Sequence, residues 1–299
     1  MKPIGKYKNG NYSVIIFDDG TKIRKTEEDE FIPSFSENSD VKITDKCNQG
    51  CQYCYEGCTS NGKHAELDFN SSFFQSLHPY TELALNGNDM DHPQLTELLS
   101  FLKERNVIAN ITVNQNQFID NFERIKEFQE NGILHGIGVS LISVTDDLLG
   151  KMSKLKNIVL HTIVGILTKE DIEKLKDKGV KLLLLGYKDL QRGISYKSSH
   201  EGEIEINRRY IYDNLDNITT WFNVVSFDNL AIEQLDVKRV MTDEEWDEFY
   251  MGDDGQYTFY IDLVKNEYAM NSLAKNRFPI GGKTVDEMFA HVRTLEKER

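Results

Sequence analysis

Three cysteines stand close together in the first quarter of the chain. Cys47, Cys51 and Cys54 follow the spacing Cys-x3-Cys-x2-Cys, and the sequence has one further cysteine, Cys58. Thiolates this close along a chain can bind one iron–sulfur cluster, because such clusters are held by cysteine sulfur. Three ligands on a cluster of four irons leave one iron open. The spacing therefore predicts an iron–sulfur centre with a free coordination position for a substrate or cosubstrate.

Other kinds of cysteine site were weighed against this interpretation. A zinc site usually has a second Cys-x2-Cys pair or a downstream histidine pair, and the sequence has neither. A disulfide framework suits short secreted chains, whereas this one has 299 residues and opens without an apolar signal segment. A closed cluster with Cys58 as fourth ligand stays an alternative, because ferredoxins close a short cysteine run with one more. We favour Cys58 as a non-ligand, since a free cysteine often behaves as a small buried apolar residue.

The composition indicates a soluble globular protein. Hydrophobic residues make up 39% and charged residues 28%, and no apolar run approaches the roughly 18 residues of a membrane span. Free thiols and an oxygen-sensitive cluster favour a reducing cytoplasm. The 49 acidic residues outnumber the 35 basic ones, and the formal net charge of −14 repels nucleic-acid phosphates. We therefore expect neither a nucleic-acid nor a membrane partner.

Strands and helices alternate after the cysteines. Apolar residues at helical spacing, as in 95–102, predict helices, and capping-box patterns mark further helix starts at Thr168, Thr242 and Thr284. The expected strands cover residues 41–44, 83–86, 107–113, 133–140, 158–164 and 181–185. This alternation predicts an α/β protein whose parallel sheet forms a partial (β/α)6 TIM-like barrel. Chemistry in such barrels gathers where the strands end, and the cysteines follow the first strand.

The barrel is expected between two smaller parts. Residues 1–40 are predicted to form a β-hairpin appendage, because strand-like runs flank the turn signal Asp18-Asp19-Gly20. Residues 41–200 form the barrel. Residues 201–299 are aromatic-rich, lack cysteine and are expected to form an α+β extension that covers the barrel mouth.

The segment Cys47-Asn48-Gln49-Gly50-Cys51-Gln52-Tyr53-Cys54 resembles the cluster loop of the radical S-adenosylmethionine (SAM) superfamily. The overall pattern also resembles uncharacterised members encoded by phages or mobile elements. The resemblance implies a partial barrel and a [4Fe–4S] cluster on Cys47, Cys51 and Cys54 whose open iron binds the amino and carboxylate groups of SAM. It places Tyr53 against the adenine. The reduced cluster would cleave SAM to a 5'-deoxyadenosyl radical, which takes a hydrogen atom from the substrate.

The segment from Asn86 to Pro93 resembles the family's Gly-Gly-Glu-Pro-x-x-His-Pro motif, which receives the amino group of SAM. Gly87 and His92-Pro93 match the motif, whereas Asn86, Asn88 and Asp89 replace its first glycine, its glutamate and its first proline. Backbone carbonyls, Asn88 or Asp89 would then have to accept the amino group. An ordinary polar loop with an Asn-Gly turn is the alternative.

Three further residues are candidates for SAM contacts. Asn114 and Ser140 end the third and fourth strands, where the family places polar SAM ligands, although ordinary strand caps are the alternative. His161 lies within the fifth strand, where a buried structural histidine is the commoner outcome.

The resemblance implies a radical SAM enzyme with a peptide, amino acid or nucleoside-like substrate and a reductant such as flavodoxin or ferredoxin. Candidate catalytic residues are Lys188 after the sixth strand and Asp228 and Glu233 in the extension, with a helix cap as the alternative for Asp228. A non-catalytic iron–sulfur electron carrier or scaffold is one alternative function. A regulatory SAM-binding protein is another, because the motif at Asn86 is altered.

Overall fold

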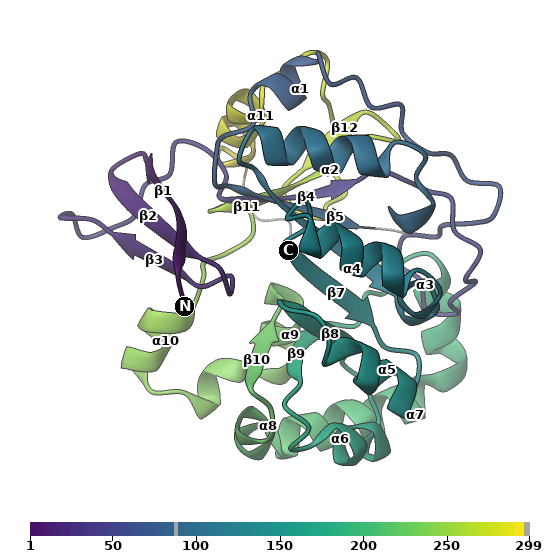
Figure 1. The fold of residues 1–299 in the computed structure, drawn as a ribbon. Coiled ribbons are helices and arrows are strands. Elements are labelled where there is room, and N and C mark those ends of the chain that lie inside the picture. The colour runs from purple at the N-terminus through teal and green to yellow at the C-terminus, as the bar shows by residue number, and fades with distance from the viewer. Residues whose placement is uncertain (87–88, 296–299) are drawn as a thin grey trace.

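One large sheet forms the centre of the molecule. The structure, a computed structural model, describes residues 1–86 and 89–295. In sheet order the strands are β10 (Val224–Phe227), β9 (Lys181–Leu185), β8 (Ile158–Ile163), β7 (Gly136–Ser140), β6 (Ile108–Asn114), β5 (Glu82–Asn86), β4 (Asn38–Lys42), β11 (Thr258–Asp262), β12 (Glu267–Ala269) and β13 (Phe278–Pro279). Neighbours from β10 to β11 are parallel, and the pairings of β12 are antiparallel (Figure 1).

The helices follow the predicted alternation. They are α1 (Ser72–Gln75), α2 (Leu95–Glu104), α3 (Gln115–Asp120), α4 (Phe122–Glu130), α5 (Asp146–Met152), α6 (Lys169–Leu175), α7 (Arg192–Asp213), α8 (Leu215–Trp221), α9 (Asn229–Leu235), α10 (Asp243–Phe249) and α11 (Val285–Val292), with short 3-10 turns at Asp89–Asp91 and Val237–Val240. The leucines of α2 are fully buried in the core. The capping boxes predicted at Thr168, Thr242 and Thr284 are confirmed, because each threonine side chain accepts the third backbone N–H of its helix. Within the described ranges, no helix is long and apolar enough to cross a membrane.

The prediction of an α/β fold with a mostly parallel sheet is confirmed, and the predicted partial (β/α)6 barrel is not confirmed. In the described part of the chain the sheet is open, with β10 and β13 at its edges. Strands from the C-terminal third occupy both sides of the six predicted ones, since β10 pairs with β9 and β11 pairs with β4. These pairings use the backbone groups through which β4 and β9 would have to meet to close a barrel.

The segment beyond residue 200 contributes to the central sheet. The predicted boundary at residue 200 falls inside α7, where His200 leaves helical geometry. The strands that follow, β10 and β11, join the two sides of the six-stranded core.

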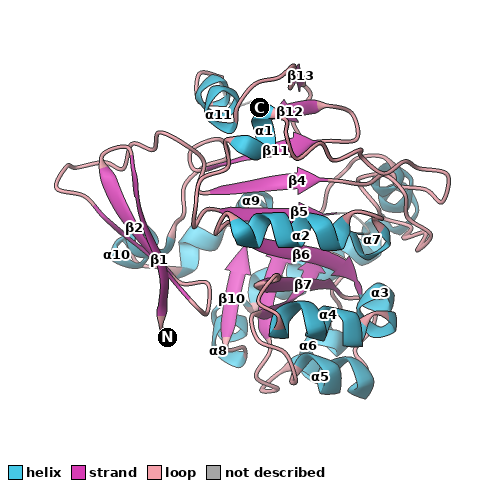
Figure 2. Ribbon diagram, turned by 45° about the horizontal axis from the view of Figure 1, so that its top comes forward, coloured by secondary structure: helices cyan, strands magenta, loops and turns pink. Residues whose placement is uncertain are grey.

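The N-terminal residues form a separate sheet of three antiparallel strands, β1 (Pro3–Asn9), β2 (Tyr12–Phe17) and β3 (Lys22–Lys25). Figure 2 shows this sheet beside the end from which β4 and β5 begin. Its predicted turn meets the central sheet, because the carbonyl oxygen of Asp18 accepts hydrogen bonds from His135 Nε2 (3.1 Å) and Asn157 Nδ2 (2.7 Å). The hairpin turn therefore covers the N-terminal ends of the parallel strands.

A buried carboxylate joins the two sheets. Glu37, just before β4, is 1% exposed and accepts hydrogen bonds from Arg24 Nε (2.7 Å) and Tyr12 Oη (2.7 Å). Lys22 lies 3.7 Å from Glu37 and 2.5 Å from Glu82 on β5. Because a buried charge without a partner is costly, these ion pairs fix the position of the N-terminal sheet.

Replacing Glu37 with Gln should lower the free energy of unfolding by about 3–5 kcal/mol, because the Arg24 guanidinium loses its buried counter-charge. Urea denaturation followed by circular dichroism measures this. Glu28→Gln is the control, since Glu28 is an exposed hydrogen-bond acceptor of the same sheet and its loss should cost no more than about 0.5 kcal/mol. A loss from Glu37→Gln no larger than the control would contradict the proposed anchoring role.

Candidate functional site

A cavity of about 660 Å³ runs along one face of the central sheet. Side chains alternate between the two faces of a strand, and on β5 Leu83 and Leu85 pack into the same buried cluster as the leucines of α2. The intervening residues line the cavity: Asn38 and Asp40 of β4, Glu82, Ala84 and Asn86 of β5, Asn110, Thr112 and Asn114 of β6, Gly136, Gly138 and Ser140 of β7, and His161 of β8. The alternation thus gives the sheet one apolar face under the helices, whereas the cavity face carries mostly polar and small residues on β4 to β7 and mostly apolar ones on β8 and β9.

The cysteines lie at the cavity, in the loop after β4. Cys47, Cys51 and Cys54 are half-buried and line its wall, as does Tyr53. The described residues contain no set of three histidine, cysteine or acidic side chains arranged around one metal ion. A [4Fe–4S] cube presents a different iron to each thiolate, so three cysteines on one cavity wall suit a cluster better than a single ion. Burial raises the pKa of the Cys47 and Cys51 thiols.

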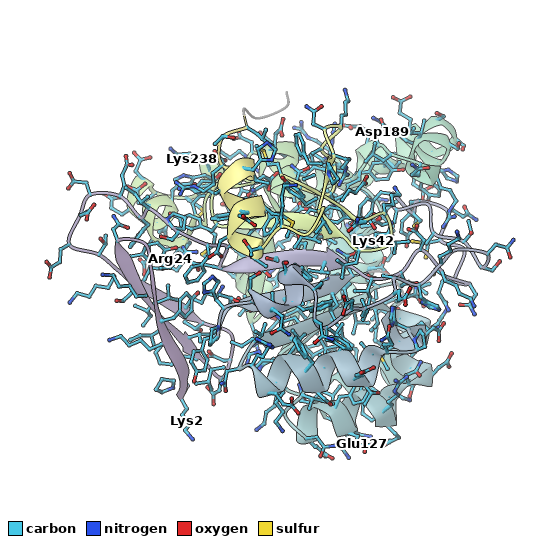
Figure 3. All side chains as sticks on the ribbon, turned by 90° about the horizontal axis from the view of Figure 1, so that it is seen from above. Lys2, Arg24, Lys42, Glu127, Asp189 and Lys238 are labelled. Atoms are coloured by element: carbon cyan, nitrogen blue, oxygen red, sulfur yellow. The ribbon has the colours of Figure 1, made fainter. Side chains whose placement is uncertain are left out.

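A buried lysine anchors the cysteine loop. Lys42, the last residue of β4, is 2% exposed, and its ammonium lies 2.5 Å from Asp45, 2.7 Å from Glu56 and 3.8 Å from Asp262 (Figure 3). Burial alone would lower the pKa of Lys42, but the three carboxylates outweigh it and raise the pKa above its ordinary value. Asp45 and Glu56 flank the cysteines, so both ends of the loop are tied to one charge.

The N-terminus of α7 holds the same loop from the other side. The Arg192 guanidinium donates hydrogen bonds to the backbone oxygens of Cys51 and Cys58, each at 2.9 Å. One helical turn further, the ring of Tyr196 lies edge-on to Tyr53, with centroids 5.6 Å apart. The positions of the cysteine loop and of Tyr53 therefore depend on a helix about 140 residues away in sequence.

Cys58 is buried beside Cys54. The contact between the two thiols lowers the pKa of Cys54 and raises that of Cys58. Because Cys58 also lines the cavity, a role as fourth ligand stays an alternative.

The candidate residues at the next strand ends lie side by side. Asn114, Ser140 and His161 share one register row across β6, β7 and β8 and all line the cavity. The Asn114 Nδ2 is 3.6 Å from the Cys51 sulfur, while its Oδ1 caps α3. Burial lowers the pKa of His161 to about 4, so its imidazole is neutral at pH 7. Its ring fits beside Gly138, where an added Cβ would stand 2.2 Å from it.

The segment after β5 is only partly described. Asn86 ends β5, and its buried Oδ1 has no hydrogen-bond partner in the described structure. Gly87 and Asn88 lie outside the described residues, as does the side chain of Asp89. His92 is a buried structural residue, because its Nε2 donates to the oxygen of Ala65 and its Nδ1 accepts the backbone N–H of Gln94.

Two of the three catalytic candidates lie at the cavity. The Lys188 ammonium is 3.2 Å from Ser272 Oγ and 4.0 Å from the centre of the Tyr55 ring. Asp228 lines the cavity and is also the predicted helix cap, accepting the backbone N–H groups of Gly186 (2.8 Å) and Ala231 (2.7 Å).

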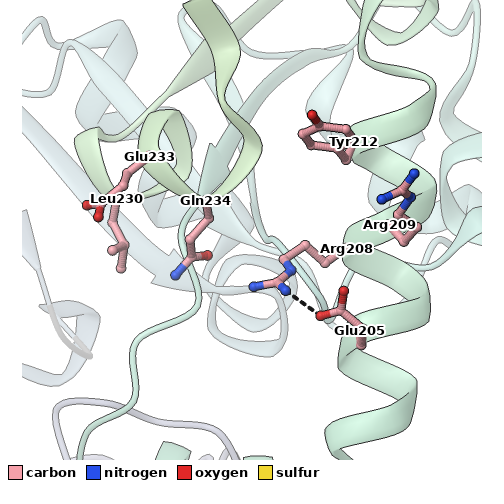
Figure 4. Close-up of a pocket in the computed structure, with 7 residues that line it drawn as sticks. All are labelled: Glu205, Arg208, Arg209, Tyr212, Leu230, Glu233 and Gln234. Atoms are coloured by element: carbon pink, nitrogen blue, oxygen red, sulfur yellow. Dashed lines mark hydrogen bonds and ion pairs between the residues drawn. The ribbon is translucent and has the colours of Figure 1, made fainter.

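The third candidate, Glu233, is placed elsewhere. It lines a separate hollow of about 470 Å³ between α7 and α9, together with Gln234 of α9 and Arg208 of α7 (Figure 4). Arg208 is already paired with Glu205 on its own helix. The structure therefore does not bring Glu233 together with the cysteines.

Sequence reasoning missed Asp40, which lies in the middle of the cavity wall. Its side chain is exposed to the cavity, and desolvation by the protein around it raises its pKa to about 6. Lys188 opposes the rise, whereas Asp254, Asp228 and Glu56 add to it. The alternation Asn38-x-Asp40-x-Lys42 was the available signal, because it places three polar residues on one face of a strand.

This elevated pKa predicts a pH-dependent effect of Asp40→Asn. Native Asp40 binds more protons than the unfolded chain between its ordinary pKa of about 3.9 and its native pKa of about 6. Wild-type stability should therefore fall across that interval because of Asp40, and the variant lacks this fall. Urea denaturation at about pH 4 and about pH 7.5 should show a larger stability gain of the variant at the higher pH. An equal gain at both would contradict the raised pKa.

Comparisons with known proteins identify the fold and leave the family open. No protein-family model matches the sequence, and no curated protein matches it either. The crystal structure of Streptococcus suis SuiB bound to precursor peptide SuiA is similar, with a TM-score of 0.55 and 12% identity over 89% of this chain and 69% of SuiB. SuiB bound to S-adenosylmethionine matches with a TM-score of 0.51 and 11% identity over 88% and 69%. At these identities the chain shares with SuiB a mixed α/β fold built on a large, mostly parallel sheet.

Proposed function

We propose that this protein is a radical SAM enzyme that cleaves S-adenosylmethionine reductively and abstracts a hydrogen atom from a peptide substrate. One observation carries the proposal. The Cys-x3-Cys-x2-Cys loop follows a parallel strand and lines the same cavity as the neighbouring strand ends. In folds with parallel strands, ligands bind at the carboxyl ends of the strands.

The residues present fit the proposed cofactors. A [4Fe–4S] cluster on Cys47, Cys51 and Cys54 would supply the electron that cleaves SAM to methionine and a 5'-deoxyadenosyl radical. The unpartnered Oδ1 of Asn86 is a suitable acceptor for the SAM amino group, in place of the glutamate that the altered motif lacks. The half-buried ring of Tyr53 would pack against the adenine.

The remaining strand-end residues would contact SAM or orient the cluster loop. Asn114 would donate its side-chain N–H toward the Cys51 sulfur, from which it is now 3.6 Å away. Ser140 and neutral His161 lie next to it in the same row and would offer hydrogen bonds to the ribose or carboxylate. Gly138 leaves the space that the His161 ring occupies.

We also propose that the sheet curves as a partial barrel. The chain beyond residue 200 would lie over the mouth of this barrel. The side chains of β4 to β9 that face one cavity support it. A peptide substrate is supported by the likeness to SuiB, which was crystallised with a precursor peptide. A reductant such as flavodoxin or ferredoxin would provide the electron.

Single replacements of Cys47, Cys51 or Cys54 by Ala should abolish binding of the cluster, because a [4Fe–4S] cube needs all three thiolates. Iron and acid-labile sulfide would be counted after anaerobic reconstitution. Cys58→Ala is the matched control and should retain a full complement of iron. Loss of iron from this control would favour a closed four-thiolate cluster, and with it the electron-carrier alternative.

The reconstituted and reduced wild-type protein should convert SAM to 5'-deoxyadenosine, with liquid chromatography and mass spectrometry as the measurement. Cys51→Ala, reconstituted in parallel, controls for cleavage by free iron and reductant. SAM binding without product, in protein with a full cluster and a peptide library added, would contradict the enzyme and favour a regulatory SAM-binding protein.

A further inference from the structure

A second group of cavity residues lies away from the cysteines, on the middle of the sheet. Asp40, Ala84, Asn110 and Gly136 face each other in one register row across β4, β5, β6 and β7, and all line the cavity. Asn38 lies two residues before Asp40 and therefore on the same face of β4. The small residue Ala84 leaves room in this row between Asp40 and Asn110, whereas the Asn110 side chain fills the space beside Gly136.

The Asp40 carboxylate and the amide oxygens of Asn38 and Asn110 are hydrogen-bond acceptors in this region. Among the described residues, none donates a hydrogen bond to the Asp40 carboxylate or pairs with it within 4.0 Å. The amide oxygens of Asn38 and Asn110 are buried and unpartnered. The unpartnered oxygen of Asn110 does not result from a flipped amide, because the Asn110 Nδ2 donates to the Glu82 carboxylate at 3.0 Å. A buried acceptor without a donor costs about 1–3 kcal/mol, so a ligand that brings donors to this wall gains free energy there.

Three carboxylates and one cation surround Asp40. Asp228, Asp254 and Glu56 all repel negative charge at Asp40, and Lys188 is the opposing cation. Lys188 is held by Ser272 and by the ring of Tyr55 rather than by Asp40. Of the carboxylates, Glu56 is paired with Lys42, Asp228 caps α9, and Asp254 accepts from Asn229 and Asn271. Among these four carboxylates, Asp40 alone makes no ion pair or hydrogen bond within the described structure, although Glu56 also has one unpartnered oxygen.

We propose that the Asp40 wall binds the ammonium or guanidinium group of a lysine or arginine residue in the substrate. A cationic side chain supplies a positive charge to the Asp40 carboxylate and N–H donors to the asparagine oxygens. The placement of that residue in a peptide rests on the proposed function, whereas recognition of the cation rests on the wall alone.

The test is binding of small probes to the full chain, reconstituted anaerobically, followed by isothermal titration calorimetry at about pH 8, above the pKa of Asp40. Nα-acetyl-lysine methylamide and Nα-acetyl-arginine methylamide should bind at least about tenfold more tightly than the norleucine analogue, which has a similar stem and no charge. Asp40→Asn should remove most of that preference. Glu127→Gln is the control, because it removes one carboxylate from the exposed face of α4 at the edge of the molecule (Figure 3) and should change nothing.

Equal affinity for the lysine and norleucine probes would overturn the inference, and this comparison uses the wild-type chain alone, so it does not depend on folding of a variant. A folded Asp40→Asn protein with the full lysine preference would also overturn it. So would tighter binding of Nα-acetyl-glutamate methylamide, because Lys188 would then govern recognition.

The result of this binding test can be distinguished from the result of the SAM-cleavage test. Lysine preference in a protein that does not cleave SAM would support the binding site and count against the enzyme. SAM cleavage in a protein that binds lysine and norleucine equally would support the enzyme and overturn this inference.

Discussion

The position of the candidate site depends on one buried ammonium group. Lys42 ends the first strand of the parallel sheet, and its three carboxylate partners come from the two ends of the cysteine loop and from β11. Removing a charge from water is costly unless its partners stay in place, so moving the loop would leave Lys42 or its carboxylates buried and alone. The contact to Asp262 extends the same constraint to the C-terminal third of the chain. Lys42 therefore links the cysteine loop to β4 and β11.

The sheet can support such a site because its two faces have different roles, packing against the helices on one side and lining the cavity on the other. Apolar residues such as Leu85 and Val113 pack under the helices and stabilise the fold, which frees the other face to carry polar groups. Several of these groups are unsatisfied in the protein alone, among them the oxygens of Asn86 and Asn110. A ligand that donates hydrogen bonds to these groups would recover the free energy that they lose on burial, as expected for a functional surface.

Local sequence patterns predicted most of the fold and the part of the site that is local in sequence. The helix at 95–102, the capping box at Thr168 and the cysteine loop each rest on residues within a few positions of one another. The pairing of β10 and β11 with the sides of the six predicted strands does not, because strands distant in sequence decide it. The first strand was expected at 41–44 but spans Asn38–Lys42, since its partners β5 and β11 set its limits. Because the strand begins at Asn38, Asp40 lies within it, and the expected bounds of 41–44 left Asp40 out of the predicted site.

The shape of the cavity limits what can reach Asp40. At the N-terminal ends of the strands, the hairpin turn lines the cavity with Asp19 and Gly20 and is held by the bonds to the Asp18 carbonyl. The cysteine loop lies at the opposite ends of the strands, and Asp40 lies between, in the middle of β4. A ligand group that enters beside the cysteine loop must therefore cross part of the sheet before it meets the carboxylate. Lysine and arginine carry their charge on long, flexible apolar stems, so a residue held near the cysteine loop could still place its cation against Asp40.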